Sequence, residues 1–315
     1  MMLARVADSL YWIGRYVERA EHYARLSDVM LNATLDRSEA ATQVARIALA
    51  AIGDPDLAKA QNPYDAARAL TLDRHDSVSI YSSIANAREN ARQVRDQITT
   101  ETWERLNLIY LRMSGPDAAD AFEDGSQLFL HDTIADLHLF KGAGDSTMSH
   151  GEGWSFLLLG VYLERAQLIG SLLEVVFGEG RKRRPVGNHF ALTSVLRMGC
   201  ALEPYLRTYT ADMQPRYILK FLMLDEDFPR SIRFCTQQIE THLAAITRHA
   251  GFSGSSGPER LAGRLRARLQ YADMDELEAQ GASAFLTTVL DECLAIHAGL
   301  YDAFVAYPLE DRLPA

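Results

Sequence analysis

The sequence predicts an all-α protein, a multi-helix bundle built from two duplicated helical halves. Helix-favouring residues such as Ala, Leu, Arg, Glu and Gln are abundant, and alternating strand patterns are nearly absent. Start and stop signals divide the chain into helix-sized segments. One seven-residue pattern also occurs twice, far apart in the chain, which indicates an internal duplication.

Helix boundaries are clearest where proline follows a capping or breaking residue. Asn62 and Pro63 form a strong start, because Asn caps a helix and the first helical position does not need the N–H that proline lacks. Residues 114–116, 228–229 and 257–258 mark further boundaries. The expected helices lie near residues 3–34, 38–51, 63–71, 78–98, 101–113, 117–140, 152–177, 189–210, 214–223, 229–249, 258–272 and 282–305.

The repeated pattern is G-x-Y-x-E-R-A, at residues 14–20 and again at residues 160–166. A second match supports it, because Leu-Asp precedes Ser-Ile at equal spacing in residues 72–80 and 224–232. We therefore expect two helical repeats, packed as one compact domain with a pseudo-twofold axis, over residues 1–145 and 146–315.

Composition excludes several classes of protein. Of the 315 residues, 48% are hydrophobic and 23% charged, which is typical of a globular protein rather than a disordered one. A formal net charge of −10 disfavours nucleic-acid binding, which depends on neutralising phosphates. The three scattered cysteines (Cys200, Cys235 and Cys293) favour neither a disulfide framework nor a zinc site, and we expect them to be buried apolar residues.

No targeting segment is evident. The N-terminus lacks a secretory signal, and the longest nearly apolar run, residues 154–163, is shorter than the roughly 20 residues of a membrane span. We expect a cytoplasmic protein that does not enter the membrane and that could form a homo-oligomer.

Acidic residues within apolar helices are the most informative feature. Glu18 and Glu21 lie on or beside the apolar stripe of the first helix, and Glu164 lies in a helix that is apolar all round. A buried carboxylate must meet a cation, a hydrogen-bond network, a metal or a proton. Arg19 and Arg165 point about 100° away from the adjacent glutamates, so each charge should reach another helix.

Two interpretations of these residues stay open. They could be structural ion pairs that clamp the bundle, or they could line a ligand or catalytic centre in which Glu18 and Glu164 act as general acid/base or metal ligands. Gly14 and Gly160 stand one turn before each glutamate and allow close helix approach in either case.

An arginine row forms a second candidate site. Arg88, Arg92 and Arg95 share a helix face, and their guanidinium groups could bind carboxylate or phosphate. They could equally brace Glu18 or Glu164, or face solvent.

Two aspartates and one basic run complete the candidates. Asp73 and Asp225 precede helices at equivalent places and could cap them or bind a cation or ligand. The basic run at residues 181–184 could be a solvated loop or a docking patch for an acidic partner.

Several mechanisms lack their residues. There is no P-loop, dinucleotide fingerprint, H-E-x-x-H or G-x-S-x-G motif, and no histidine follows a glutamate at the di-iron spacing. Glu18 and His22 could hold one metal ion, but Leu168 replaces the histidine in the second pattern. We therefore expect no metal and no cofactor.

Four segments together resemble the bacterial alpha-E family, a helical domain whose biochemical function is not established. They are L-A-R-V-A-D-S-L-Y-W-I-G-R-Y-V-E-R-A-E (residues 3–21), A-R-E-N-A-R-x-V-R-D-Q with E-x-W (87–103), E-G-W-x-F-L-x-L-G-x-x-L-E-R-A (152–166) and F-P-R-S-I-R-F-C (228–235). The resemblance covers nearly the whole chain. Family members usually carry Arg after the second glycine, where this chain has Val161.

The resemblance implies a partner system. Members are commonly encoded beside, or fused to, circularly permuted ATP-grasp proteins and near transglutaminase-like proteases. It places the family's acidic and basic residues at Glu18, Glu164, Arg19, Arg88, Arg92 and Arg165. The leading hypothesis is an accessory module that works with an ATP-grasp-type ligase in peptide synthesis or modification and binds a carboxylate-bearing peptide or a phosphate. One alternative is a carboxylate-based enzyme, with or without a metal ion, that acts on a peptide or amide in the same pathway. The other is a purely structural scaffold.

Overall fold

A computed structural model describes residues 2–36, 38–178, 188–210, 212–250 and 257–306, apart from the side chains of residues 58 and 280. Within these ranges the chain is helical without any strand, which confirms the all-α prediction. The α-helices are α1 (Ala4–Thr34), α2 (Glu39–Ile52), α3 (Pro63–Leu72), α4 (Ile80–Gln93), α5 (Thr100–Ser114), α6 (Ala118–Thr147), α7 (Glu152–Phe177), α8 (His189–Met198), α9 (Leu202–Tyr209), α10 (Pro215–Leu224), α11 (Ile232–His249), α12 (Gly257–Gln270), α13 (Met274–Gln280) and α14 (Ala282–Leu300). A 3₁₀ helix η1 (Leu57–Lys59) and a π-helical turn η3 (Tyr301–Val305) are also present.

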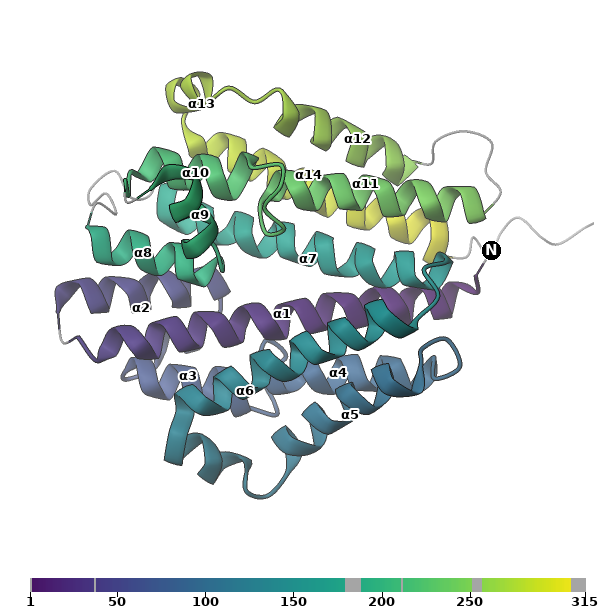
Figure 1. Cartoon of the computed structure of the whole chain (residues 1–315), viewed down its shortest axis with the longest axis horizontal. Coiled ribbons are helices and arrows are strands. Elements are labelled where there is room, and N and C mark those ends of the chain that lie inside the picture. Colours follow the sequence, from purple (N-terminus) through teal and green to yellow (C-terminus); the bar gives the residue numbers. More distant parts are fainter. Residues whose placement is uncertain (1, 37, 179–187, 211, 251–256, 307–315) are drawn as a thin grey trace, which may run out of the picture.

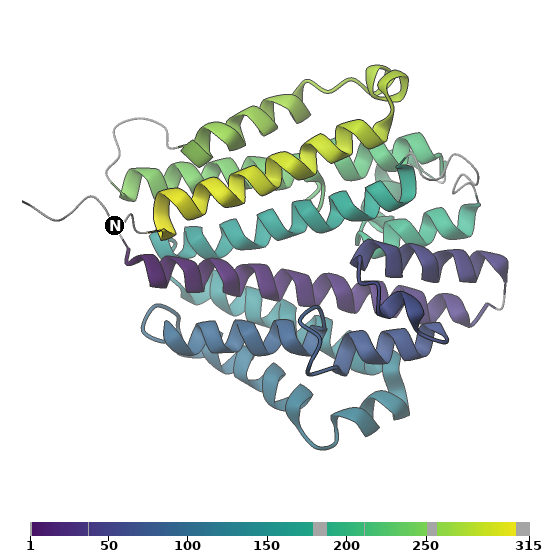
Figure 2. The same ribbon diagram turned by 180° about the vertical axis from the view of Figure 1, so that it is seen from behind.

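Helices α1 and α7 form the centre of the bundle and run side by side in the same direction (Figure 1). Helices α3 to α6 pack on one side of this pair, and α10 to α14 pack on the other, as both views show (Figures 1 and 2). This placement explains why α7 is apolar on most faces: it contacts α1, α11 and α14 at once.

The central pair approaches closely at two glycines. A Cβ atom on Gly14 would overlap the carbonyl oxygen of Leu157, and one on Gly160 would overlap the carbonyl oxygen of Tyr11. Only glycine fits at these positions, so the backbones of α1 and α7 are in direct contact one turn before each buried Glu-Arg pair. Although these contacts are reciprocal, the internal duplication and the division into residues 1–145 and 146–315 stay predictions.

The expected helix over residues 189–210 is two helices. Helix α8 ends at Met198, and Cys200 has a left-handed backbone with a φ of 55°. The amide of Ala201 donates to the carbonyl of Leu196 at 2.7 Å, and that of Cys200 donates to Arg197 at 3.0 Å. This pair of bonds is the Schellman ending, which turns the chain before α9 begins.

Two of the three cysteines are buried, as predicted from the sequence. Cys235 and Cys293 are buried, and burial raises the pKa of each thiol to about 12. Cys200 is half-buried instead, because it stands in the turn between α8 and α9.

Two helical stretches, Glu152–Phe177 and Ala282–Val305, have the length and composition of a membrane span. The most apolar window of the first is 78% buried inside the bundle, whereas that of the second is 28% buried. The first is therefore accounted for as the core helix of the fold. The basic run at residues 181–184 lies outside the described residues.

Candidate functional site

Glu18 of α1 is fully buried and is held by three cations from other parts of the fold. Arg165 of α7 donates to its two carboxylate oxygens from Nε and Nη2, at 2.7 and 2.8 Å. Lys141 of α6 donates from Nζ at 2.5 Å, and Arg230, in the turn before α11, donates from Nη1 at 3.2 Å. Three separate elements therefore meet at one carboxylate.

Glu164 of α7 is the reciprocal site. Its carboxylate accepts from Arg19 Nε at 2.6 Å and from Arg15 Nε, both on α1. Arg15 also donates to the hydroxyl of Tyr11 and to the amide oxygen of Gln167, each at 2.7 Å. Each glutamate of the two Glu-Arg patterns thus pairs with the arginine of the other pattern.

Glu21 extends the centre by one turn of α1. Its carboxylate accepts from Arg25 Nε at 3.0 Å, from Lys141 at 2.5 Å and from Arg230 Nη2. His138 of α6 lies 3.1 Å from the same carboxylate. Lys141 and Arg230 therefore bridge Glu18 and Glu21, which joins the two carboxylates in one network.

All three carboxylates are held in their ionised form. Burial alone would raise the pKa of Glu18, but the adjacent guanidinium of Arg165 and the ammonium of Lys141 outweigh it, and the pKa is well below its ordinary value. The pKa of Glu21 is lowered against its own burial, chiefly by Lys141. Arg15 and Arg19 lower the pKa of Glu164 in the same way.

Cations outnumber carboxylates in this network. The carboxylates are Glu18, Glu21 and Glu164, and the cationic side chains bound to them are Arg15, Arg19, Arg25, Lys141, Arg165 and Arg230. No other carboxylate of the described residues pairs with any of these six cations. Uncompensated charge in a desolvated place is costly, so the centre favours an additional anion.

Solvent reaches one edge of this centre. The side chains of Arg15, Arg165 and Arg230 are 8–11% exposed, whereas those of Lys141 and Arg19 are 24% and 22% exposed. A cavity of about 190 Å³ lies beside Lys141 and Arg165. Its apolar walls come from α1, α6 and α7 and include Val17, Phe140, Trp154, Leu157, Leu158 and Val161.

His22 is buried next to the centre and stays neutral. Its Nε2 atom has no hydrogen-bond partner among the described residues. Burial, assisted by the charge of Arg230, lowers its pKa to about 4. The described part of the chain contains no group of three His, Cys, Asp or Glu side chains that could hold a metal ion.

The structure does not bring the arginine row to the centre. Arg88 donates to Asn107 at 2.7 Å and lies over the rings of Trp103 and Tyr110. Arg92 is exposed and pairs with Glu89 of its own helix. Helix α4 turns its small apolar face toward α1, so its arginines lie on other faces.

Asp73 and Asp225 also lie outside the centre, each at the end of a helix. Asp73 accepts backbone N–H groups from His75 and Asp76, and Asp225 accepts them from Asp227 and Phe228. These bonds shape the two short loops that lead into α4 and α11.

The loop after Asp225 positions one of the centre's cations. The Ser231 hydroxyl donates to the carbonyl of Asp225, and Arg230 stands next to it with its guanidinium on Glu18 and Glu21. Asp225 therefore supports the centre indirectly, through the backbone.

Sequence reasoning identified the glutamates, Arg19 and Arg165, but it missed other cations of the centre: Arg15, Arg25, Lys141 and Arg230. Arg15 was detectable in principle, since it stands one turn before Arg19 in a helix whose stripe is buried. Nothing in the local sequence indicates that Lys141 or Arg230 would reach α1.

This fold and centre define a class of all-helical proteins with a pair of reciprocal Glu-Arg contacts in the core. The sequence profile of the Alpha-E family, described as a predicted alpha-helical domain with a conserved ER motif, matches residues 2–305. The chain belongs to the Alpha-E family.

Similar sequences occur in two mycobacteria. Uncharacterized proteins from Mycobacterium bovis and Mycobacterium tuberculosis are 28% identical over 324 aligned residues, which include 95% of this chain. The chain spans 36% of the length of these relatives. No solved structure matches it.

Proposed function

We propose that the protein is a binding module whose charged centre receives the carboxylate of a peptide, or a phosphate, and that it serves an ATP-grasp-type ligase in peptide synthesis or modification. The observation that carries the proposal is the excess of cations, six against three carboxylates. An anion that joins them would relieve the uncompensated charge.

Lys141 is the cation best placed to receive this anion. Its ammonium has three N–H groups, and two of them point at Glu18 and Glu21. Its side chain is partly exposed and lines the cavity, so a small anion with an apolar body could approach the third.

The charge state of the glutamates argues against the rival enzyme hypothesis. A general acid must carry a proton near neutral pH, and a general base needs a free oxygen lone pair near its substrate. The pKa values of Glu18 and Glu164 are lowered, and both carboxylates are already engaged by cations. The arrangement therefore supports binding better than proton transfer.

Anion binding is testable by calorimetric titration with inorganic phosphate and with N-acetyl-alanyl-alanine at low ionic strength. The wild type should bind at least one of them, and the affinity should fall as salt is added. Lys141→Met should weaken binding about tenfold or more, since a charged hydrogen-bond donor is lost. Arg92→Met is the matched control, because it removes an exposed cation outside the centre and should change nothing.

Partnership with a ligase needs a separate experiment. The tagged protein should retain an ATP-grasp ligase from a lysate of the native host. Absence of the ligase from the eluate, with the ligase present and soluble in the lysate, would contradict this half of the proposal.

A further inference from the structure

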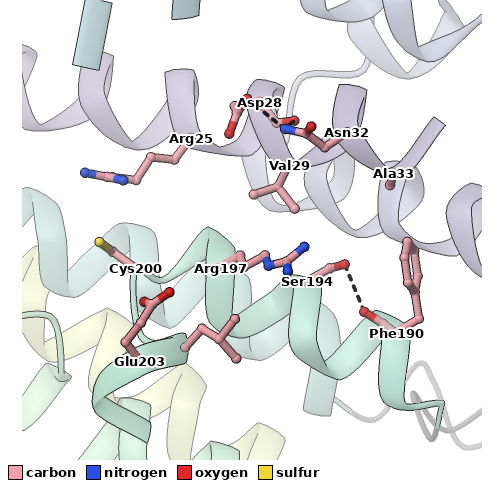
Figure 3. A pocket seen from close by; sticks show the side chains of 11 residues that line it. Arg25, Asp28, Val29, Asn32, Ala33, Phe190, Ser194, Arg197, Cys200 and Glu203 are labelled. Carbon is pink, nitrogen blue, oxygen red and sulfur yellow. Dashed lines mark hydrogen bonds between the residues drawn. The ribbon is translucent and has the colours of Figure 1, made fainter. Parts of the chain in front are cut away.

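A second, larger cleft lies between α1 and the turn that joins α8 to α9. Its volume is about 460 Å³, within the roughly 300–1,000 Å³ that small-molecule sites usually occupy. Figure 3 shows residues of α1 on one side of it and residues of α8 and α9 on the other. Its charged side chains are Arg25, Asp28, Arg197 and Glu203.

The cleft shares one cation, Arg25, with the buried centre. The α1 side contributes one cation and one anion, Arg25 and Asp28, and both already have protein partners. Arg25 binds Glu21, and Asp28 accepts from Asn32 at 2.9 Å. Because both side chains already bind protein groups, they are less available to a ligand than the charges on the opposite side.

The opposite side of the cleft carries the two charges that remain available. No hydrogen bond or ion pair connects the side chain of Arg197 or of Glu203 to another side chain in the described ranges. They nevertheless line the same cleft without pairing with each other. A ligand that presents a negative group to Arg197 and a positive group to Glu203 would satisfy both.

The backbone between these two residues is strained. Cys200 adopts the left-handed conformation with a φ of 55°, which glycine adopts freely and which is sterically unfavourable for other residues. The adjacent Gly199 has an ordinary φ of −79°, so the left-handed residue of this turn is the cysteine and not the glycine. The strained turn sets where Glu203 stands relative to Arg197, and strain of this kind gathers at binding sites.

We infer that this cleft binds a small dipolar ligand with both a free carboxylate and a free ammonium group, which means an amino acid or a short unblocked peptide. Arg197 receives the carboxylate and Glu203 receives the ammonium. The apolar side chains of Val29, Phe190 and Leu202 line the space available to the body of the ligand. This inference does not rest on the proposed function, since neither Arg197 nor Glu203 contacts the buried centre.

Calorimetric titration with alanine and three forms of alanyl-alanine tests the assignment. The unblocked dipeptide should bind at least tenfold more tightly than N-acetyl-alanyl-alanine or alanyl-alanine amide, because each block removes one charge. Free alanine distinguishes the two sources of the same chemistry: stronger binding of alanine identifies an amino-acid site, and stronger binding of the dipeptide identifies a peptide site.

Matched variants separate the two charges. Arg197→Gln should weaken binding of the unblocked dipeptide about tenfold but leave the amide unaffected, and Glu203→Gln should do the same with respect to the N-acetyl form. Both residues are exposed, so the variants should fold. Arg207→Gln, on the exposed face of α9 outside the cleft, is the control.

Three results would overturn the inference. The first is no saturable binding of alanine or the unblocked dipeptide, and the second is equal binding of the blocked and unblocked forms. The third is a loss in Arg197→Gln that is the same for every probe. The same titrations of Lys141→Met, in which the buried centre is impaired, should still show the preference for the unblocked dipeptide over its N-acetyl form, so failure of the buried centre and failure of this cleft are distinguishable.

Discussion

Gly14 and Gly160 lie at equivalent places in the crossing of α1 and α7, each against a backbone carbonyl of the other helix. A side chain on Gly14 would overlap the oxygen of Leu157, and one on Gly160 would overlap that of Tyr11. A backbone oxygen cannot rotate away, so a larger residue must push the helices apart. The glycines therefore set the distance over which the Glu-Arg pairs form.

Gly14→Ala and Gly160→Ala should each destabilise the protein. Separating the helices loses packing worth about 1–3 kcal/mol, more than the roughly 1 kcal/mol that alanine gains in helix propensity. Chemical denaturation measures the difference. Gly142→Ala is the control: this exposed residue of α6 has open space around it, so the substitution should stabilise the fold. Unchanged stability in both crossing variants would contradict the close contact.

Glu18→Gln should cost about 3–5 kcal/mol of unfolding free energy, because it leaves Arg165, Lys141 and Arg230 without the charge they bind. Replacing the exposed Arg92 with alanine should cost under about 1 kcal/mol, although it also breaks an ion pair. Urea denaturation at pH 7 gives both values. Equal losses of unfolding free energy in the two variants would show that the buried ion pairs of Glu18 stabilise the fold no more than an exposed pair does.

Sequence reasoning succeeded where the physical cause is local. The helical fold and the glutamates in apolar stripes follow from periodicity within single helices. Because adjacent Glu and Arg diverge on a helix, their pairing across to another helix was also predictable. The close pairs of Glu18 with Arg165 and of Glu164 with Arg19 have this origin.

The rest of the centre depends on tertiary placement. Lys141 and Arg230 reach Glu18 from α6 and from a loop, and no periodicity relates either of them to α1. The place of the arginine row also depends on tertiary packing. Helix α4 ends at Gln93, so Arg95 lies beyond the helix, and the face of α4 that meets α1 carries Ala87 and Ala91, which places Arg88 on another face.

The free energy of unfolding should decrease in two stages as the pH is lowered from neutral. Protonation of His22 dominates the first stage. His22 has a pKa of about 4 in the folded protein and an ordinary value of 6.5 when unfolded. The unfolded chain therefore binds the extra proton between these values, and stability present above pH 6.5 is lost as the pH falls. The loss should be about 2 kcal/mol between pH 7.5 and pH 5 from this residue. His242, whose pKa is also lowered to about 4 by burial, adds to it.

The glutamates govern the second stage. Their folded pKa values lie below the ordinary 4.5, so the stability they contribute is complete above pH 4.5 and is lost below it. Denaturant midpoints from pH 7.5 to pH 3 separate the stages. His22→Phe should flatten the curve above pH 4.5 and leave the lower limb in place. An identical curve for the variant would show that His22 is not held neutral.

Cys200→Gly should stabilise the protein by about 1 kcal/mol, against the usual effect of replacing a buried or half-buried side chain. Glycine adopts the observed φ of 55° without steric cost, whereas cysteine does not, and the Schellman bonds to Leu196 and Arg197 involve only backbone atoms.

Cys200→Ala is the control, because it removes the thiol and keeps the strain, so it should not stabilise. Thermal denaturation under reducing conditions compares the variants. If glycine and alanine have the same effect, the thiol rather than the backbone determines stability at this turn. If glycine is the more stable of the two, the fold retains a strained residue in the wall of the cleft between α1 and α8–α9, and dipeptide binding by Cys200→Gly then shows whether that strain serves the ligand.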